Sequence, residues 1–502
     1  MKITIYDGAA TIGGNKIRVE EKGKGIFLDF GMNFSKHGQY YDEFLRERSS
    51  RGIYDAVQLG IIPRLNIYRK DLIPSDLDVS GFSKLDVSAV FLSHAHLDHC
   101  GCVGYLDEGI AIAATAATLA MLKAMRDTMK FGPGIEAPYF ARKHPKDDGR
   151  ILEANRSRKD PYECRSMFCT EKMREDLLEF LRQSHRTKGI EIPECGHMED
   201  LAHPFSVKAF ELDHSIYGAC GFLIEGDIAL AYTGDFRMHG RGAEKTARFL
   251  KKARKASVLI IEGTKAGEGE GISEDDVFRN CLEIAEEARG LIVADFSPRN
   301  FERLEMFGEI AKKAGRELVV TAKDAYMLRA LECADGADRM KDNRVYLELK
   351  AQRDGWEEYV LELYRDRIVD PREIEKSPEK FILCFSYHDV KHLLDIKPES
   401  GIYIYSSSEA HSEEEQFDFL RLSSWLKLFN FEVYGFRVEE GKVIFERGFH
   451  ASGHAPSEDL IEAIEIVDPD VIIPVHTERA EWFAKHFGER VKIVREGDFF
   501  VI

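Results

Sequence analysis

The chain has 502 residues, of which 44% are hydrophobic and 31% are charged, and its formal net charge is -18. A chain of this length holds about two to four domains that each bury a core of their own. The sequence contains no run of about eighteen apolar residues, so we expect no membrane association. Proteins that bind nucleic acid usually have a positively charged surface, and the negative net charge of this chain does not indicate one. The nine scattered cysteines fit a reducing cytoplasm, which is the predicted location.

The N-terminal part of the chain is predicted to be β-rich, because short apolar runs alternate there with glycines. The expected strands are residues 2–6, 16–20, 25–29, 89–92 and 111–114. Residues from about 124 to 205 are interpreted as a mostly helical, polar insertion, since 171–182 has apolar residues at helical spacing. Further strands are expected at 205–211, 220–225 and 228–232.

From about residue 243 apolar strands and amphipathic helices alternate, which is typical of a parallel sheet with helices on its faces. The expected strands are 258–262, 291–294, 317–321, 381–385 and 402–405, and the expected helices are 274–288, 300–314 and 412–429. The last stretch, with strands at 471–475, 491–494 and 499–502, returns to the style of the N-terminal half. The sequence therefore predicts an α/β fold with a first domain at 1–236, an inserted α/β domain at 237–435, and a return to the first domain at 436–502.

The strongest chemical signal is a cluster of metal-ligand side chains at residues 93–99, which read Ser-His-Ala-His-Leu-Asp-His. The cluster directly follows the apolar run 90–92, so its side chains leave the end of a strand together. Imidazole nitrogens and carboxylate oxygens are suitable ligands for Zn(II) or a similar divalent ion. Three histidines and an aspartate within six residues therefore predict a metal site rather than surface histidines.

Two further ligand candidates follow expected strands. His214 lies just past one strand, and Asp235 ends another in the segment Tyr-Thr-Gly-Asp-Phe. A single histidine at a strand end is usually structural, but both residues become candidates beside the first cluster. A carboxylate such as Asp235 can bridge two metal ions about 3.5–4 Å apart, the separation used in two-metal hydrolysis.

The His-x-His-x-Asp-His cluster, the later histidine and the Thr-Gly-Asp segment resemble the signature of the metallo-β-lactamase superfamily. The resemblance implies an αββα sandwich and two metal ions. It places His94, His96 and His214 on one metal, Asp98 and His99 on the other, and Asp235 between them. Asp29, in Phe-Leu-Asp-Phe-Gly, matches the aspartate that orients the histidine loop from behind in that family.

Three later positions narrow the resemblance to the β-CASP subgroup of nucleic-acid hydrolases. Glu262 ends a strand, His454 lies in His-Ala-Ser-Gly-His-Ala, and His476 ends a strand in Ile-Ile-Pro-Val-His. The inserted α/β domain also stands where this subgroup has its insertion. By this resemblance His476 completes the shell of the second metal. In this subgroup a histidine at that position is typical of enzymes that act on RNA, and a valine is typical of enzymes that act on DNA.

The resemblance implies a zinc-dependent ribonuclease with two zinc ions, acting in RNA processing or decay. Asp98, His454 and Glu262 are the expected catalytic residues, since the leaving oxygen needs a proton that His454 could give and Glu262 could orient. His450 and Ser452 match phosphate-binding positions of the ribonuclease J family. Donors at strand ends of the α/β domain could also take phosphates, and Ser297 and Ser407 are the expected ones.

Several alternatives remain open at the level of sequence. The segment Ile-Ile-Glu-Gly-Thr is closer to the nucleases that cleave mRNA 3′ ends, so exonuclease and endonuclease action are both open. Rival functions are a DNA nuclease of the same subgroup, a small-molecule hydrolase of the lactonase or thioesterase type, and an inactive scaffold. A homodimer is also open.

Two features of the insertion leave a choice between a function and an ordinary surface. Basic clusters at residues 142–146 and 156–159 are either solvated faces or contacts for nucleic acid. Cys164, Cys169, Cys195 and His197 are either free side chains or a structural zinc site, and their irregular spacing favours free thiols.

Overall fold

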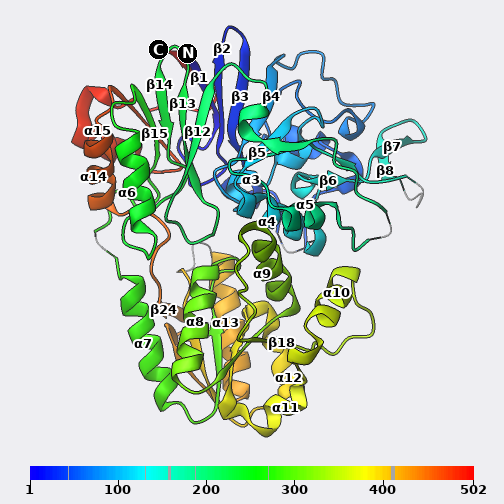
Figure 1. Cartoon of the computed structure of the whole chain (residues 1–502), viewed down its shortest axis with the longest axis vertical. Coiled ribbons are helices and arrows are strands. Elements are labelled where there is room, and N and C mark those ends of the chain that lie inside the picture. Colours follow the sequence, from blue (N-terminus) through cyan, green and yellow to red (C-terminus); the bar gives the residue numbers. More distant parts are fainter. Residues whose placement is uncertain (43, 130–131, 156–159, 187, 270, 409–412) are drawn as a thin grey trace.

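A computed structural model gives the arrangement of the chain and describes every residue except 43, 130–131, 156–159, 187, 270 and 409–412. Two packed sheets form the upper half of the molecule in Figure 1, and a third sheet flanked by helices forms the lower half. The two termini lie side by side at the top, where β26 (Phe499–Val501) pairs with β1 (Lys2–Asp7). The expected α/β fold class is confirmed.

The first sheet of the upper half has eight strands. In spatial order they are β11 (Cys195–His197), β10 (Met167–Cys169), β5 (Ala111–Ala114), β4 (Asp86–Phe91), β3 (Lys24–Phe30), β2 (Lys16–Glu21), β1 and β26. Pairing is antiparallel from β26 to β3 and parallel from β3 to β11. The helix α4 (Ala116–Thr128) packs beside this sheet and is buried along most of its length.

The second sheet has five strands and faces the first across an apolar core. The strands are β12 (Ser206–Glu211), β13 (Cys220–Glu225), β14 (Ala229–Tyr232), β15 (Val258–Glu262) and β25 (Val471–Val475). Ile5 and Leu28 from the first sheet share this core with Phe222, Ile260 and Ile473 from the second. The outer face of the second sheet is covered by α6 (Ala243–Lys252), α14 (Ser457–Val467) and α15 (Ala480–Phe487). The upper half is therefore an αββα sandwich.

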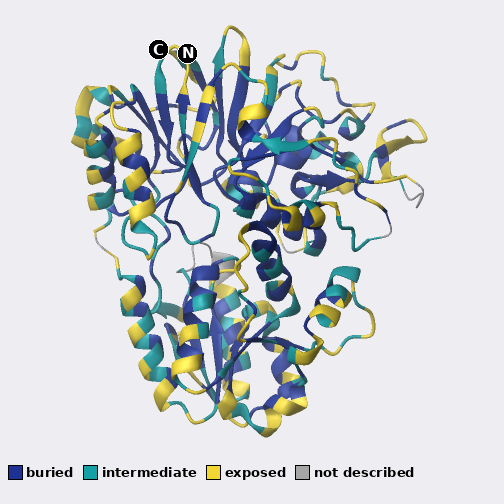
Figure 2. Ribbon diagram, viewed as in Figure 1, coloured by how far each residue is buried: buried dark blue, intermediate teal, exposed yellow. Residues whose placement is uncertain are grey.

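The third sheet is parallel throughout and has seven strands. They are β19 (Ile368–Val369), β18 (Asn343–Tyr346), β17 (Glu317–Val320), β20 (Phe381–Cys384), β16 (Leu291–Asp295), β21 (Gly401–Tyr405) and β22 (Phe431–Tyr434). All five residues of β16 are buried, as expected for a central parallel strand covered on both faces. Figure 2 shows the same pattern, with buried strands inside and exposed residues on the outer helix surfaces.

Several helices of this second domain begin at a residue whose side chain caps them. The helices of the domain are α7 (Glu274–Glu287), α8 (Phe301–Lys313), α9 (Ala322–Asp335), α10 (Gly355–Leu363), α11 (Pro371–Lys376), α12 (Leu393–Ile396) and α13 (Glu413–Leu428). Ser273 caps α7 and Thr321 caps α9, each through a capping box with an aspartate three residues later. Gly336 ends α9 with a φ of 84°, a conformation that glycine adopts without steric cost.

The segment 124–205 is not mostly helical, so this prediction is wrong. Among its described residues the one α-helix beyond α4 is α5 (Glu175–Arg182), and the rest forms short strands, short 3-10 helices and turns. β10 and β11 of this segment extend the eight-stranded sheet. The hairpin of β7 (Lys143–Lys146) and β8 (Ile151–Ala154) stands apart from it. Strands of three residues leave no periodic pattern in the sequence.

The predicted start of the inserted domain at residue 237 is also too early. Both α6 and β15 belong to the sandwich, because β15 pairs with β14 on one side and with β25 on the other. The hairpin of β23 (Phe436–Glu439) and β24 (Lys442–Phe445) packs against the core of the seven-stranded sheet. We therefore propose domain limits close to residues 262 and 446. The strand expected at 491–494 is absent, since Val491 makes only an isolated bridge with Ile472.

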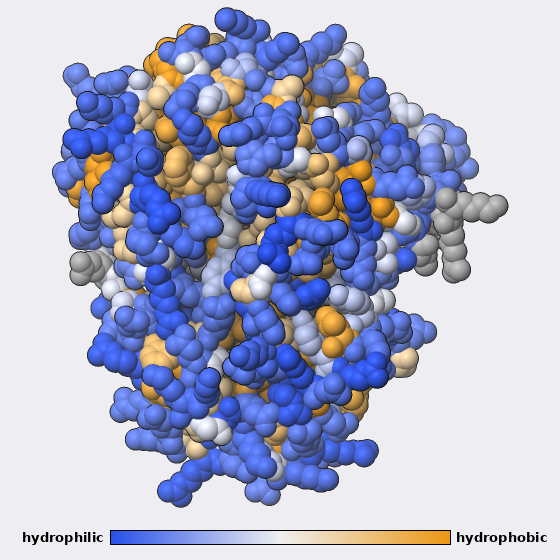
Figure 3. All heavy atoms as spheres, in the orientation of Figure 1, coloured by the Kyte–Doolittle hydropathy of each residue, from blue (hydrophilic) through white to orange (hydrophobic). Residues whose placement is uncertain are grey.

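Within the described residues no helix is long and apolar enough to cross a membrane. The face of the molecule in Figure 3 is mainly hydrophilic, with scattered apolar residues among the charged ones.

A buried polar cluster joins the two domains where α4 meets α9 (Figure 1). The carboxylate of Asp127 on α4 accepts a hydrogen bond from the Tyr326 hydroxyl of α9 at 2.6 Å. The same carboxylate binds the ammonium group of Lys123 and the hydroxyl of Tyr139. A buried carboxylate is costly unless its oxygens accept hydrogen bonds, so these bonds stabilise the contact between the domains.

We expect Tyr326→Phe to lower the free energy of unfolding by about 1–3 kcal/mol, because it removes a donor from a buried carboxylate. Chemical denaturation followed by circular dichroism measures the change. Tyr364→Phe is the matched control, since the buried Tyr364 hydroxyl has no hydrogen-bond partner. Equal stability of Tyr326→Phe and wild type would show that this hydrogen bond does not hold the domains together.

Candidate metal centre and active site

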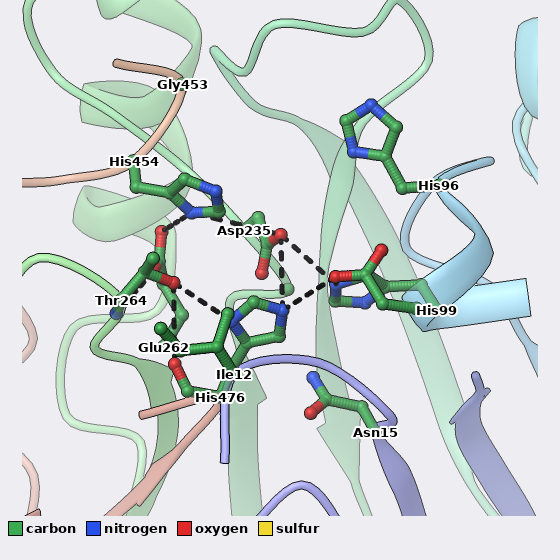
Figure 4. A network of polar contacts seen from close by, with 12 residues as sticks. Ile12, Asn15, His96, His99, Asp235, Glu262, Thr264, Gly453, His454 and His476 are labelled. Atoms are coloured by element: carbon green, nitrogen blue, oxygen red, sulfur yellow. Dashed lines mark hydrogen bonds and ion pairs between the residues drawn. The ribbon is translucent and has the colours of Figure 1, made fainter. Parts of the chain in front are cut away.

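The candidate site lies where the carboxyl ends of parallel strands from both sandwich sheets meet. Asp29 is the second-last residue of the strand β3, and residues 93–99 follow the neighbouring strand β4. On the facing sheet Asp235 follows β14, Glu262 ends β15, and His476 follows β25. Because parallel strands end at the same sheet edge, residues far apart in sequence reach one place. Figure 4 shows the side chains of His99, Asp235, Glu262, His454 and His476 pointing toward one another.

The first group of potential ligands consists of His94, His96 and His214. His94 Nε2 lies 3.1 Å and His214 Nε2 lies 3.3 Å from His96 Nδ1. Burial lowers the pKa of all three imidazoles, that of His214 to about 4, so they are neutral near pH 7. Neutral imidazole is the form that binds a metal ion.

The second group consists of Asp98, His99, Asp235 and His476. His476 Nε2 is 3.1 Å from Asp98 Oδ2, and His99 Nε2 is 3.1 Å from Asp235 Oδ2. His476 has a φ of 53°, and its backbone N–H donates to the carbonyl of Gly8 at 2.7 Å. The rings of His99 and His476 stack with centroids 5.0 Å apart.

Asp235 lies between the two groups through a single oxygen. Its Oδ2 is 3.7 Å from His94 Nε2 and 3.9 Å from His214 Nε2 in the first group. The same oxygen is 3.1 Å from His99 Nε2 and 3.8 Å from His476 Nε2 in the second. Its second oxygen, Oδ1, is buried without a hydrogen-bond partner. This is the placement expected of a carboxylate shared by two cation sites.

The donor set fits divalent cations. Within the described residues, Asp29, Asp98 and Asp235 form ion pairs only with histidines, and with no lysine or arginine. His99 Nε2 is buried and, like Asp235 Oδ1, has no hydrogen-bond partner. Clustered buried carboxylates are costly unless positive charge compensates them. The site therefore supplies lone pairs and negative charge that bound divalent cations would balance.

Asp29 orients the histidine loop through contacts with Ser93 and His99. Its carboxylate accepts hydrogen bonds from the Ser93 backbone N–H at 2.7 Å and from the Tyr232 hydroxyl at 2.5 Å. Its Oδ2 is also 2.8 Å from His99 Nδ1, which leaves the other ring nitrogen of His99 facing the site. Such a second contact fixes both the orientation and the tautomer of a ligating histidine.

His454 and Glu262 form a separate pair beside the ligand groups. His454 Nδ1 is 3.0 Å from Glu262 Oε1 and 3.9 Å from Asp235 Oδ2. Burial alone would lower the pKa of His454, but the carboxylates of Glu262, Asp235 and Asp98 together outweigh it and raise this pKa to about 9. Glu262 is itself fixed, since its two oxygens accept the backbone N–H groups of Phe236 and Thr264. These carboxylates therefore favour the protonated form of His454 at the edge of the site.

The expected phosphate contacts gather in one region next to His454. His450, Ser452, Ser407 and His454 line a cavity of about 580 Å³ between the two domains. Ser297 lies beside this cavity, with its hydroxyl oxygen 3.1 Å from that of Ser407. The Ser452 hydroxyl accepts the backbone N–H of His454 at 3.1 Å, so it also positions the acid.

Thr264 and a buried charge network escaped the sequence analysis. The Thr264 hydroxyl lies 2.9 Å from His476 Nδ1 and orients that ring. The network joins Arg237 to Asp213, Glu274 and Glu302, and it joins Arg303 to Glu274. The paired residues of this network are up to 65 positions apart, so no motif in the sequence indicates them. Thr264 could have been found, because it lies in the motif that follows Glu262.

The features of the 124–205 segment are separate from this site. Arg142 pairs with Glu108 and Glu163, so it belongs to a salt-bridged surface. The second basic cluster, Arg156, Arg158 and Lys159, lies outside the described residues. Cys164, Cys169 and Cys195 are free thiols, and with His197 they form none of the potential metal-ligand groups found among the described residues.

Comparison with known proteins supports the interpretation of this geometry. The model of the metallo-beta-lactamase superfamily matches residues 63–154, which contain the histidine cluster. The model of the Zn-dependent metallo-hydrolase RNA specificity domain matches residues 446–494, which contain His454 and His476.

Whole-length relatives agree with these two matches. Ribonuclease J of Pyrococcus abyssi is 23% identical over 99% of this chain and 96% of its own length. Ribonuclease J of Methanocaldococcus jannaschii is 23% identical over 99% of this chain and 98% of its own. A crystal structure of a protein of unknown function from Enterococcus faecalis superposes with a TM-score of 0.70 at 23% identity, covering 100% of this chain and 99% of that one. Two segments of the chain thus match the metallo-beta-lactamase superfamily and the RNA specificity domain, and the chain is similar over nearly its whole length to ribonuclease J proteins.

Proposed function

We propose that this protein is a metal-dependent ribonuclease that hydrolyses phosphodiester bonds of RNA in RNA processing or decay. One observation carries the proposal. The segment matched by the RNA specificity domain delivers His454 and His476 into the same cluster as the histidine loop of the sandwich. Ribonuclease J proteins, which align over nearly the whole chain, support RNA as the substrate.

We further propose that the centre holds two zinc ions. His94, His96 and His214 would hold one ion, Asp98, His99 and His476 would hold the other, and Asp235 would lie between them. The distances from Asp235 Oδ2 to both groups support this assignment. When bound, the ions would supply the positive charge that activates a water and stabilises the phosphate oxygens.

The chemistry left to the side chains is mainly proton transfer. Attack of water on phosphorus breaks the bond to the leaving ribose oxygen, which must take up a proton. His454 is placed to give that proton because its ring is protonated near pH 7 and lies at the edge of the cluster. Glu262 holds the ring through Nδ1 and leaves Nε2 free to act. His450, Ser452, Ser297 and Ser407 would donate hydrogen bonds to phosphate oxygens in the adjoining cavity.

The test of RNA as the substrate is a parallel assay of matched RNA and DNA strands with the metal-loaded protein. We expect cleavage of RNA well in excess of DNA. Preferential cleavage of DNA would favour the rival nuclease. Hydrolysis of lactones or thioesters without cleavage of either strand would favour a small-molecule hydrolase. A homodimer and a cytoplasmic location remain predictions.

Elemental analysis of protein purified without added metal should give about two zinc or similar ions per chain, because seven side chains converge on two sites. His214→Ala should lose mainly one of the two ions. A content below about half an ion per chain in the wild-type protein would contradict this assignment.

Asp98→Ala and His99→Ala should each abolish hydrolysis of RNA while the fold is retained, since either change empties part of the second group. Turnover of labelled RNA and circular dichroism measure the two effects. Asp342→Ala, at an exposed position, is the control. Near wild-type rates in both variants would place the active site elsewhere.

His454→Ala should lower turnover of RNA by roughly 10²–10⁴-fold, the usual contribution of a proton-transfer group. Metal content should stay the same, and Glu262→Gln should fall between this variant and the wild type. A nitrophenyl phosphodiester should partly rescue His454→Ala, because its leaving group departs without a proton. His144→Ala, at an exposed histidine, is the control.

The comparison of the two substrates decides the role of His454. If His454→Ala lowers turnover of RNA and of the activated ester equally, His454 is not the general acid and is instead a phosphate contact. Loss of metal in His454→Ala would instead make it a ligand, in keeping with its place beside Asp235 and Glu262.

A further inference from the structure

The segment 450–455, which carries the proposed acid and two of the proposed phosphate contacts, belongs to no helix or strand. Such a segment is placed by the partners that its backbone groups find elsewhere. The carbonyl oxygen of Gly453 is 2.6 Å from His214 Nδ1, and that of Ser452 accepts a hydrogen bond from Arg237 at 3.3 Å. Figure 4 shows Gly453 and His454 on this stretch of chain. The position of the acid therefore depends on the side chains that hold these carbonyl groups.

His239 is a second side chain at the Ser452 carbonyl. It lies in the loop between β14 and α6, and its Nε2 is 3.2 Å from the Ser452 carbonyl oxygen. Its Nδ1 is 3.1 Å from Asp459 Oδ2. Both neighbours are hydrogen-bond acceptors, so the ring serves as a donor toward each of them. His239 thus bridges the segment 450–455 and the first turn of α14, the helix that follows it.

Asp459 fixes the ring of His239. Its Oδ2 also accepts the backbone N–H of Met238 at 3.1 Å, so one carboxylate oxygen contacts two successive residues of the loop. The side chains of the pair are mostly buried, with 23% of His239 and 18% of Asp459 exposed. A carboxylate at one ring nitrogen sets the orientation of an imidazole, as it does for histidines that bind metals. The other ring nitrogen of His239 is thereby directed at Ser452.

The two side chains at the Ser452 carbonyl differ in what else they hold. Arg237 is buried and forms ion pairs with three carboxylates of the charge network, so its loss would disturb the contact between the domains. His239 instead lines the cavity of about 580 Å³ together with Ser452 and His454. A change at His239 therefore probes the position of the segment while the charge network stays in place.

Ser452 passes this restraint on to the acid. Its hydroxyl accepts the backbone N–H of His454 at 3.1 Å, and His454 Nδ1 is 3.0 Å from Glu262 Oε1. A general acid must lie within hydrogen-bond reach of the leaving oxygen, and an error of about 1 Å in its position can cost roughly 10²-fold in rate. The contact between His239 and Ser452 is one of the restraints that set this position.

We propose that His239 is a positioning residue for RNA cleavage. It holds the Ser452 carbonyl and, through it, the peptide that presents the Ser452 hydroxyl to a substrate phosphate and the His454 ring to the leaving oxygen. Asp459 completes the chain of contacts by fixing the His239 ring. The inference rests on the proposed ribonuclease function, with His454 as the acid.

The test replaces His239 by two amides that each keep one of its contacts. The side-chain nitrogen of Gln reaches the place of Nε2 and can donate to Ser452, whereas that of Asn matches Nδ1 and can donate to Asp459. We expect His239→Asn to lower kcat for RNA by roughly 10- to 100-fold, part of the contribution of the acid. His239→Gln should stay within about fivefold of the wild type, because the contact with Ser452 is kept. Turnover of end-labelled RNA by the metal-loaded protein measures both values.

A second substrate separates proton transfer from a general loss of structure. On a nitrophenyl phosphodiester, whose leaving group departs without a proton, His239→Asn should lose much less activity than on RNA. The ratio of RNA turnover to ester turnover should therefore fall at least about fivefold. Metal content and Tm should stay close to those of the wild type. A residue with a merely structural role would lower both activities by the same factor.

The matched control is His486→Ala. His486 is an exposed histidine of α15, and its Nδ1 also lies close to a backbone carbonyl oxygen, that of Trp482 at 2.8 Å. This contact stays within one helix on the outer face of the sandwich. The control variant should therefore turn over both substrates at the wild-type rate.

The positioning role and the proposed function fail in different ways. A wild-type kcat for RNA in His239→Asn, or equal losses in His239→Asn and His239→Gln, would overturn the positioning role. Equal losses on RNA and on the ester, or loss of metal from His239→Asn, would also overturn it, because the residue would then act on the fold or on the ligand His214. Failure of the metal-loaded wild-type protein to cleave RNA would overturn the ribonuclease function itself.

Discussion

The convergence of acidic and imidazole side chains at one edge of the sandwich is the constraint on which this structure depends. Three aspartates and six histidines meet there, and no lysine or arginine among the described residues forms an ion pair with those aspartates. Such a cluster opposes folding unless cations enter it. The metal ions are thus expected to contribute to stability as well as to chemistry, because they bind the folded chain and not the unfolded one.

The second domain depends on the first through buried charges that reach the site itself. Arg237 contacts Asp213, the residue before His214, and it donates to the Ser452 carbonyl two residues before His454. Arg303 extends this network to Ser406, beside the expected phosphate contact Ser407. Movement of the second domain would therefore disturb a ligand, the acid and the phosphate region together. This coupling ties the inserted domain to a proposed ligand, the proposed acid and the proposed phosphate contacts.

The sequence predicted the parts of this arrangement that short motifs carry. The loop 93–99 and the strand-end positions of Asp235, Glu262 and His476 were recognisable because each motif follows an apolar strand, and the structure brings these residues together. Strands as short as β10 and β11 were missed because three residues show no period. The domain limit was misplaced because β15 has the same apolar pattern as the strands of the seven-stranded sheet. The charge network of Arg237 and Arg303 depends on distances between remote segments, which a sequence does not display.

The central claim is that RNA cleavage depends on cations held by this cluster, and a stoichiometric titration tests it most directly. Protein freed of metal by chelation is titrated with Zn(II) while cleavage of end-labelled RNA is followed. The account predicts no cleavage without metal, and activity that rises until about two equivalents are bound. Full activity of the chelated protein, or no cleavage of RNA at any occupancy, would contradict it.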